Sequence, residues 1–154
     1  MQSLDATNLR GVWSAVPTPF QAGGAIDYAA LHENCRRLAG IGVDGIYTTD
    51  SDGEFYAIEF DEFKVLAGNF GRIRSALNID AQMGVTWSNT RGVIDRIKAS
   101  VDAGIPAVHV GLPFFMPVPL DDVVRFFADL AAAVPTARWI FYAHPSCLPL
   151  LKGS

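Results

Sequence analysis

The sequence predicts a parallel α/β fold in which strands alternate with helices that cover the sheet. Strand-like apolar segments begin near residues 12, 45, 79, 107 and 138, and an amphipathic segment of helical period separates each from the next. The tripeptide Ala39-Gly40-Ile41, where a helix would end and a strand begin, recurs as Ala103-Gly104-Ile105. With right-handed crossovers, such units build either a doubly wound sheet or a (β/α)8 barrel.

The first unit begins with a strand over residues 11–16, because the prolines that follow cannot donate to a ladder. Asp27 is then expected to cap a helix that ends at Gly40. The second unit has a strand over residues 45–49, which leads into a loop at 50–54 and a second helix. The apolar faces of these helices comprise Leu31, Cys35 and Leu38, and then Phe60, Phe63, Leu66, Ala67 and Phe70.

The remaining strands are expected over residues 79–85, 107–111 and 138–142. Ser88 or Asn89 would cap the helix between the first two of these strands, and Gly104 would end it. A proline-rich loop at 112–119 leads into the helix before the last strand. The buried faces predicted for these two helices are Val93, Ile94, Ile97 and Val101, and then Val123, Val124, Phe127 and Leu130.

Composition argues against several classes of protein. The net charge is −4 and no Lys or Arg cluster is present, so a nucleic-acid interface is not expected. No apolar run approaches the roughly 18 residues that span a bilayer, and the N-terminus does not read as a signal peptide. Cys35 and Cys147 lack a CxxC pair or a histidine at ligand spacing, so we expect no metal site, no disulfide and a cytoplasmic location.

The length limits how much of a barrel the chain can build. A closed barrel needs eight units and about 250 residues, whereas these 154 residues hold about five. If the fold is a barrel, residues 1–154 are the N-terminal part of a single TIM-barrel domain, without a second domain. No strand is followed by a GxGxxG or GxxxxGK[ST] motif, and no cofactor is expected.

Candidate functional residues lie where strands end, because chemistry in parallel βα folds sits at the carboxyl ends of strands. Ser51 and Gly53 precede a predicted helix, so backbone N–H groups there could hold a small carboxylate, although Asp52 would repel it. The alternative is a simple capped helix start. Tyr142 could transfer a proton at the end of the fifth strand, or it could pack as an amphipathic aromatic residue.

Other strand-end residues have structural interpretations. Thr18 follows the first strand, and Glu54 would either fix the loop or lie in the first helical turn. His109 and His144 read more simply as packed histidines than as catalysts.

Taken in chain order, these segments resemble the dihydrodipicolinate synthase/N-acetylneuraminate lyase family. The opening at 11–27 contains a Thr-Pro-Phe turn and a G-x-I-D helix start, residues 42–46 read GVDGI, and residues 51–54 match the end of the family's GTTGE loop. The family's remaining motifs are a threonine-containing helix cap, a proline followed by two aromatic residues, and Y-N-x-P. They correspond to Asn89-Thr90-Arg91, Pro113-Phe114-Phe115 and Tyr142-Ala143-His144-Pro145.

The resemblance implies a (β/α)8-barrel class I aldolase or lyase that acts on pyruvate or a related 2-keto acid. In such enzymes a lysine on the sixth strand forms a Schiff base with the keto carbon. By resemblance, Tyr142 would assist proton transfer, Ser51 with the N–H groups near Asp52 and Gly53 would bind the pyruvyl carboxylate, and the enzyme would be a homo-oligomer.

The sequence departs from the family in ways that bear on function. Asp50-Ser51-Asp52 replaces Gly-Thr-Thr, and Phe115 stands where the synthases place a second tyrosine, which argues against a true synthase. The run at 111–117 and the pair Phe55-Tyr56 are closer to the lyase and hydratase-aldolase branches. The family's lysine follows on the strand after Tyr142. Lys64 and Lys98 fall on predicted helices, and Lys152 is too near Tyr142 to take that place. We therefore expect that the chain lacks the imine lysine and is inactive alone.

Two alternatives remain open. A non-catalytic half-barrel could persist by self-association, because a second copy would cover its bare strand edges. An unrelated (β/α) enzyme could instead use Tyr142 and the histidines.

Overall fold

The computed structural model describes residues 9–113 and 119–143. In this part of the chain, five strands form one parallel sheet in the order β1-β2-β3-β4-β5. They are β1 (Trp13–Ala15), β2 (Gly45–Thr48), β3 (Asp80–Gly84), β4 (Ala107–Val110) and β5 (Arg138–Phe141). Each strand lies beside the next one in the chain, as in a barrel wall, whereas a doubly wound sheet reverses its strand order. The barrel alternative is therefore the correct one.

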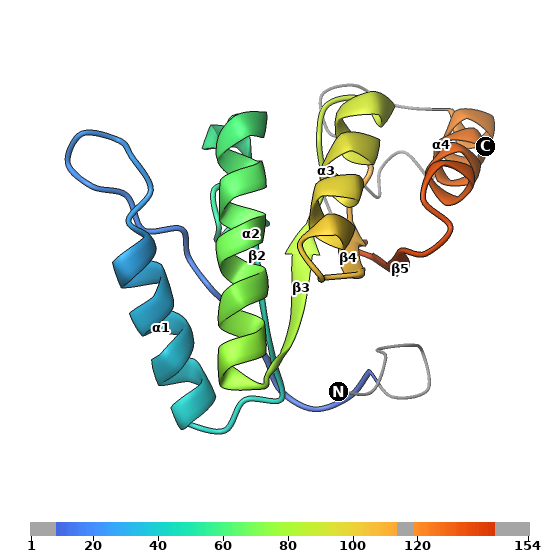
Figure 1. Ribbon diagram of the computed structural model, residues 1–154. Helices are drawn as coiled ribbons and strands as arrows, with labels where there is room; N and C mark the ends of the chain where they lie inside the picture. The colour runs from blue at the N-terminus through green and yellow to red at the C-terminus, as the bar shows by residue number, and fades with distance from the viewer. Residues whose placement is uncertain (1–8, 114–118, 144–154) are drawn as a thin grey trace.

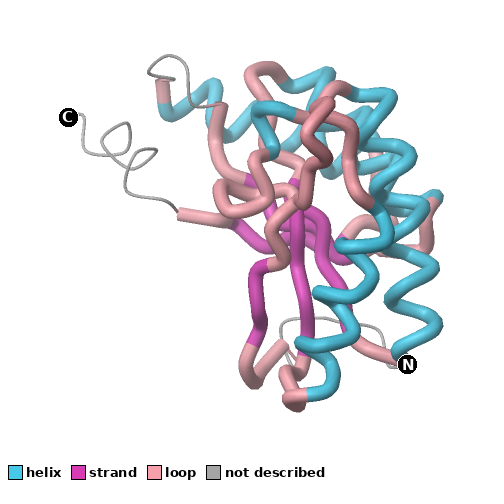
Figure 2. The backbone as a smooth tube through the Cα atoms, turned by 90° about the vertical axis from the view of Figure 1, so that its left-hand side faces the viewer, coloured by secondary structure: helices cyan, strands magenta, loops and turns pink. Residues whose placement is uncertain are grey.

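Four helices connect these strands: α1 (Tyr28–Gly40), α2 (Phe60–Leu77), α3 (Thr90–Asp102) and α4 (Leu120–Ala133). They follow one another along the sheet, with α4 next to β5 (Figure 1). Figure 2 shows that they lie on one side of the strands. Right-handed crossovers place successive helices on the same face in this way, and that face holds the apolar core. The largest fully buried side chains there include Phe63, Phe70, Leu31, Ile46, Ile97 and Leu130.

Helix ends follow the expected chemistry with one correction. The side chains of Asp27 and Asn89 accept hydrogen bonds from the N–H groups of Ala30 and Gly92, as N-caps. Gly104 adopts φ +79° directly after the cap of α3. The expected cap at Gly40 is wrong, because α1 continues through that residue and Gly42 takes the left-handed conformation, with φ +84°.

The predicted buried faces of α1 and α2 hold except at Leu38 and Phe60, which are only partly buried, whereas the faces of the later helices shift. On α4, Val124 is 63% exposed, and Phe126 is buried with Val123 and Leu130. The spacing i, i+3, i+7 is as helical as the predicted one, so periodicity could not choose between them. On α3, Ile94 and Val101 are only partly buried, whereas Arg96 and Ser100 are buried.

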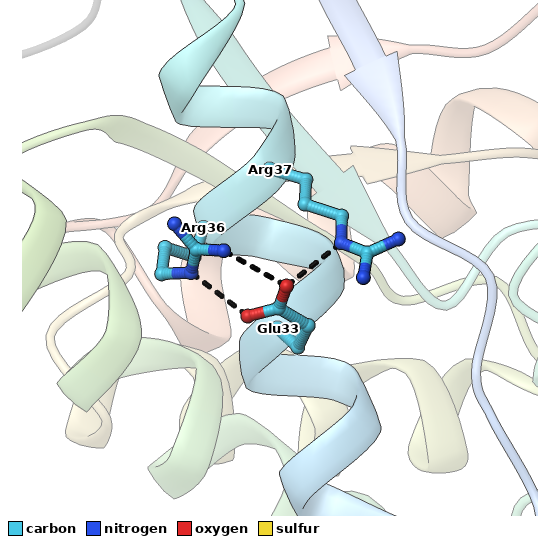
Figure 3. A network of polar contacts seen from close by, with 3 residues as sticks. All are labelled: Glu33, Arg36 and Arg37. Atoms are coloured by element: carbon cyan, nitrogen blue, oxygen red, sulfur yellow. Dashed lines mark hydrogen bonds and ion pairs between the residues drawn. The ribbon is translucent and has the colours of Figure 1, made fainter.

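An acidic residue on α1 joins two arginines on the outer surface (Figure 3). Glu33 accepts hydrogen bonds from Arg36 Nε at 2.8 Å and from Arg37 Nε at 2.7 Å. These bonds lower the pKa of Glu33 to about 2. The contacts span three and four residues of one helix and are solvent-exposed, so they support α1 locally.

The described residues contain neither a helix that could cross a membrane nor a candidate metal cluster. No helix in these ranges is long and apolar enough to cross a membrane. No group of three or more His, Cys, Asp or Glu side chains among them could hold a metal ion. Cys35 is buried in the core, and Cys147 lies outside the described residues.

Candidate active site at the carboxyl end of the sheet

The loop after β2 is fixed to both neighbouring strands at its base. Thr48 Oγ1 donates to the Val16 carbonyl at 2.9 Å, and Thr49 Oγ1 donates to the Gly84 carbonyl at 2.8 Å. Both threonines are fully buried, and Thr49 takes a left-handed conformation with φ 59°. The chain therefore leaves the sheet in a defined direction.

Thr18 supports the same loop from the first strand end. Its Oγ1 donates to the Gly53 carbonyl at 2.7 Å, and Thr18 is buried. Gly53 is itself held close to the loop base, because a Cβ there would lie 2.5 Å from the Thr49 nitrogen. Thr18, which the sequence places at the end of the first strand, is therefore in direct contact with the loop at 51–54.

Asp50 organises the turn from within. Its Oδ1 accepts hydrogen bonds from the N–H groups of Asp52 at 3.0 Å and of Gly53 at 3.3 Å. Asp50 is 9% exposed, and burial raises the pKa of its carboxyl. The side chain therefore uses the two backbone donors that sequence analysis assigned to a bound carboxylate.

The expected helix start at this loop is wrong. The segment after Glu54 is a short 3₁₀ helix, η1 (Phe55–Ala57), and α2 begins only at Phe60, where Glu59 and Glu62 form a capping box. Glu54 is exposed and takes φ 52°, so it is not a first-turn helix carboxylate. Ser51 and Asp52 are exposed at the loop tip. Without an adjacent α-helix, no helix dipole favours an anion there.

Aromatic residues from three strands gather on the other face of the sheet, opposite the helices. Tyr47 on β2 pairs with Gln82, and Gly84, two residues along β3, pairs with His109 on β4, so the side chains of Tyr47, Gln82 and His109 share one face. The His109 ring lies 5.5 Å from the Tyr47 ring and 6.4 Å from the Tyr142 ring, between centroids.

The loop and the aromatic cluster interact electrostatically. Burial raises the pKa of Tyr47, and the nearby groups of Asp50, Asp52 and Tyr142 raise it further. Tyr142, just beyond β5, is 44% exposed and can meet a ligand. The structure therefore brings the predicted Tyr142 and the predicted loop to one edge of the sheet, with Tyr47 between them.

His109 is a buried histidine without a hydrogen bond at one ring nitrogen. Its Nε2 is enclosed and unpartnered, and burial lowers its pKa to about 4. The folded state therefore keeps His109 neutral, whereas the unfolded chain binds a proton near pH 6.5. Lowering the pH from about 6.5 to about 4 consequently destabilises the fold.

We expect this group alone to reduce the free energy of unfolding by about 3 kcal/mol across that pH window. His109→Asn removes the titrating ring, so the difference between variant and wild-type stability should shrink as the pH falls from 7 to 4. Urea denaturation at a series of pH values measures both curves. Parallel curves for the two proteins would show that His109 titrates normally in the fold.

Arg96 holds the segment that follows the loop. It is 4% exposed, and its guanidinium carbon lies 3.6 Å from the centroid of the Trp87 ring. Its Nη2 donates to the Ile58 carbonyl at 3.3 Å and its Nη1 to the Gly92 carbonyl at 3.4 Å. A charged residue in an amphipathic helix is normally solvent-facing, so sequence analysis did not find this role.

The lysines of the described chain lie away from this edge. Lys64 on α2 and Lys98 on α3 are both exposed, as predicted, and Lys64 pairs with Asp61 at 2.7 Å. Lys152 lies outside the described residues, as do Phe114, Phe115 and His144.

The whole arrangement matches one family of known proteins. The model of the dihydrodipicolinate synthetase family matches residues 8–148. The chain belongs to this family. Its fold is accordingly part of a TIM barrel, with the site edge formed by the carboxyl ends of β1 to β5.

Curated relatives of this family member include hydratase-aldolases and uncharacterised lyases. The trans-O-hydroxybenzylidenepyruvate hydratase-aldolase of Pseudomonas aeruginosa is 28% identical over 150 residues, covering 92% of this chain and 44% of the relative. An uncharacterised DapA-like lyase of Pyrococcus furiosus is 33% identical over 141 residues, covering 90% and 46%. The chain thus spans about half the length of the relatives it matches.

Solved structures agree on the fold. YagE from Escherichia coli K12, a dihydrodipicolinic acid synthase family protein in complex with pyruvate, superposes with a TM-score of 0.85 at 25% identity, covering 91% of this chain and 46% of that one. PhdJ bound to a substrate intermediate gives a TM-score of 0.83 at 27% identity, covering 100% and 49%.

Proposed function

We propose that this chain supplies the carboxylate-binding loop and the acid–base phenol of a Schiff-base-forming lyase that acts on pyruvate or a related 2-keto acid. The family supports an aldolase-type lyase. One observation carries the assignment to particular residues: the loop at 50–54 and Tyr142, which come from β2 and β5, meet at one edge around Tyr47 and His109.

The proposed chemistry requires an amine that none of the described lysines provides. Condensation of a lysine amine with the keto carbon releases water and gives a protonated imine, which accepts the electron pair of the breaking or forming carbon–carbon bond. Tyr142 carries the proton to or from the reacting oxygen or carbon. Ser51 and the N–H groups near Asp52 and Gly53 would hold the pyruvyl carboxylate once the Asp50 side chain, which accepts from both N–H groups, has moved aside.

Within the family, we propose the hydratase-aldolase branch. Several curated relatives are hydratase-aldolases named for arylidene pyruvates, at 27–33% identity. The pyruvate complex of YagE and the substrate intermediate of PhdJ support a pyruvate-type substrate. The proposed product set is therefore pyruvate and an aldehyde.

A fusion protein tests this function. The chain would be joined to the second half of the Pseudomonas aeruginosa hydratase-aldolase, incubated with pyruvate, reduced with borohydride and weighed by intact mass spectrometry. We expect one pyruvyl adduct. Tyr142→Phe in this fusion should slow deuterium exchange into the pyruvate methyl group by about 100-fold.

Tyr56→Phe is the matched control, because Tyr56 is an exposed tyrosine of η1 and should leave the exchange rate unchanged. A fusion that forms no adduct, or a Tyr142→Phe fusion that exchanges at the wild-type rate, would contradict the proposal.

The alternative function is a non-catalytic half-barrel that self-associates. The observation in its favour is that the described helices cover only one face of the sheet (Figure 2). Sedimentation of the 154-residue chain decides this point: self-association predicts a dimer or larger species whose melting temperature rises with concentration. A monomer with a cooperative melt would contradict it.

A further inference from the structure

We infer that Asp50 is a specificity-determining residue of this site, whose carboxylate already occupies the backbone donors that would hold the carboxylate of a 2-keto acid. The inference rests on the proposed function, because that function assigns the donors to the substrate. With the Asp50 carboxylate in place, the anion-binding donors of the loop are occupied, and a substrate carboxylate can bind them only by displacing the Asp50 side chain.

The geometry of the turn supports this competition. One oxygen of Asp50, Oδ1, accepts from the Asp52 nitrogen at 3.0 Å and from the Gly53 nitrogen at 3.3 Å. Each backbone N–H carries a single hydrogen, so a donor engaged by Asp50 is not available to a second carboxylate at full strength. Gly53 cannot turn away readily, because its carbonyl accepts from Thr18 and a Cβ there would lie 2.5 Å from the Thr49 nitrogen.

The negative charge of the loop also disfavours binding of an anionic substrate. Asp50 is a nearly buried carboxylate, and the exposed carboxylate of Asp52 lies two residues away. A bound 2-keto acid would add another negative charge beside the nearly buried carboxylate of Asp50. The family has glycine at the position of Asp50, and glycine carries neither a negative charge nor a side-chain hydrogen-bond acceptor.

Removing the Asp50 carboxylate should therefore open the site. We would label the 154-residue chain with ¹⁵N and follow the Asp52 and Gly53 amide signals during titration with sodium pyruvate. Asp50→Ala is expected to give saturable shifts at both amides, with an apparent affinity at least about tenfold tighter than wild type, as expected for losing a competing charged hydrogen bond. Pyruvamide, which lacks the carboxylate, should not gain affinity.

Matched variants distinguish the effect of the Asp50 hydrogen bonds, which occupy the backbone donors, from the effect of removing one negative charge from the loop. Asp52→Asn removes the same charge from the same loop but leaves the Asp50 hydrogen bonds in place, so its affinity should change less than about threefold. Asp50→Asn keeps an oxygen acceptor without the charge, and we expect it to fall between wild type and Asp50→Ala. If the amide signals of Asp50→Ala lose their dispersion, that variant is unfolded and the Asp50→Asn titration replaces it. Tighter pyruvate binding by Asp50→Asn than by Asp52→Asn then supports the inference. Equal pyruvate affinity of these two variants overturns it.

Two further results would overturn the inference. One is wild-type protein that shows the same pyruvate-dependent shifts at Asp52 and Gly53 as Asp50→Ala. The other is a folded Asp50→Ala protein that shows no shifts, because free donors would then not make an anion site. Neither result bears on whether the fusion protein forms an imine, so failure of the inference and failure of the proposed function are distinguishable.

Discussion

Arg96→Ala is expected to lower the free energy of unfolding by about 4 kcal/mol. The substitution removes the guanidinium that stacks on Trp87 and donates to the Ile58 carbonyl, and it leaves a cavity between α2 and α3. A buried hydrogen bond to a charged donor contributes about 1.5–3 kcal/mol, and a desolvated cation–π contact adds about 2. Because Ile58 follows the loop at 50–54, the loop amides should also exchange faster with solvent.

Arg72→Ala is the control for this experiment. Arg72 lies exposed on α2 and donates to Asn69 at 3.0 Å, so its loss should change stability by less than about 0.5 kcal/mol. Urea denaturation measures both variants. Arg96→Lys should also be destabilising, because an ammonium cannot both stack flat on Trp87 and reach two carbonyls. An Arg96→Ala protein as stable as Arg72→Ala would show that the contacts of Arg96 with Trp87 and the Ile58 carbonyl contribute nothing to the free energy of unfolding.

Gly84→Ala is expected to destabilise the fold by about 3 kcal/mol and to disrupt the site. A Cβ at Gly84 would overlap the Thr49 carbonyl oxygen and lie 2.7 Å from His109 Nε2. Neither neighbour can move away easily. The contacted atom of Thr49 is its backbone carbonyl oxygen at the base of the loop, and His109 is packed between two tyrosine rings. Overpacking of this kind typically costs 1–3 kcal/mol and moves the backbone.

Gly68→Ala provides the matched control. Gly68 lies within α2, and a Cβ there would meet only Arg72 Nη1, at 3.9 Å. Alanine should stabilise this helix by roughly 0.5–1 kcal/mol, because glycine loses more backbone entropy on folding. Thermal unfolding of the two variants should thus shift in opposite directions. A Gly84→Ala protein that melts with the wild type would show that the strand-end packing tolerates a methyl group.

Periodicity was sufficient to predict the alternation of strands and helices, but it left both the barrel and the doubly wound sheet open. Leu31 on α1, and Phe63 and Phe70 on α2, lie on the predicted apolar faces of their helices, and all three are buried. Asp27 lies directly before an apolar-periodic segment, which is the pattern of an N-cap. These features depend on neighbours in sequence, so local rules capture them.

The details of the site depend on contacts between distant segments, and sequence rules did not capture those. Thr49 and Glu54 take left-handed conformations that non-glycine residues rarely adopt, so the loop's path was not predictable from composition. Asp50 was identified as a departure from the family motif, but its hydrogen bonds to the turn were not foreseen. Tyr47 was not identified from the sequence, because an aromatic residue within a predicted strand is usually interpreted as a residue that packs in the core.

We propose that this chain carries a carboxylate loop and a phenol but no amine able to form the imine. Borohydride reduction of the unfused 154-residue protein with pyruvate, followed by intact mass measurement, tests it most directly. We predict an unchanged mass, because Lys64 and Lys98 are exposed on helices and Lys152 is too close to Tyr142 in the sequence to take the place of the family's lysine. A stoichiometric pyruvyl adduct on Lys64, Lys98 or Lys152 would contradict the claim.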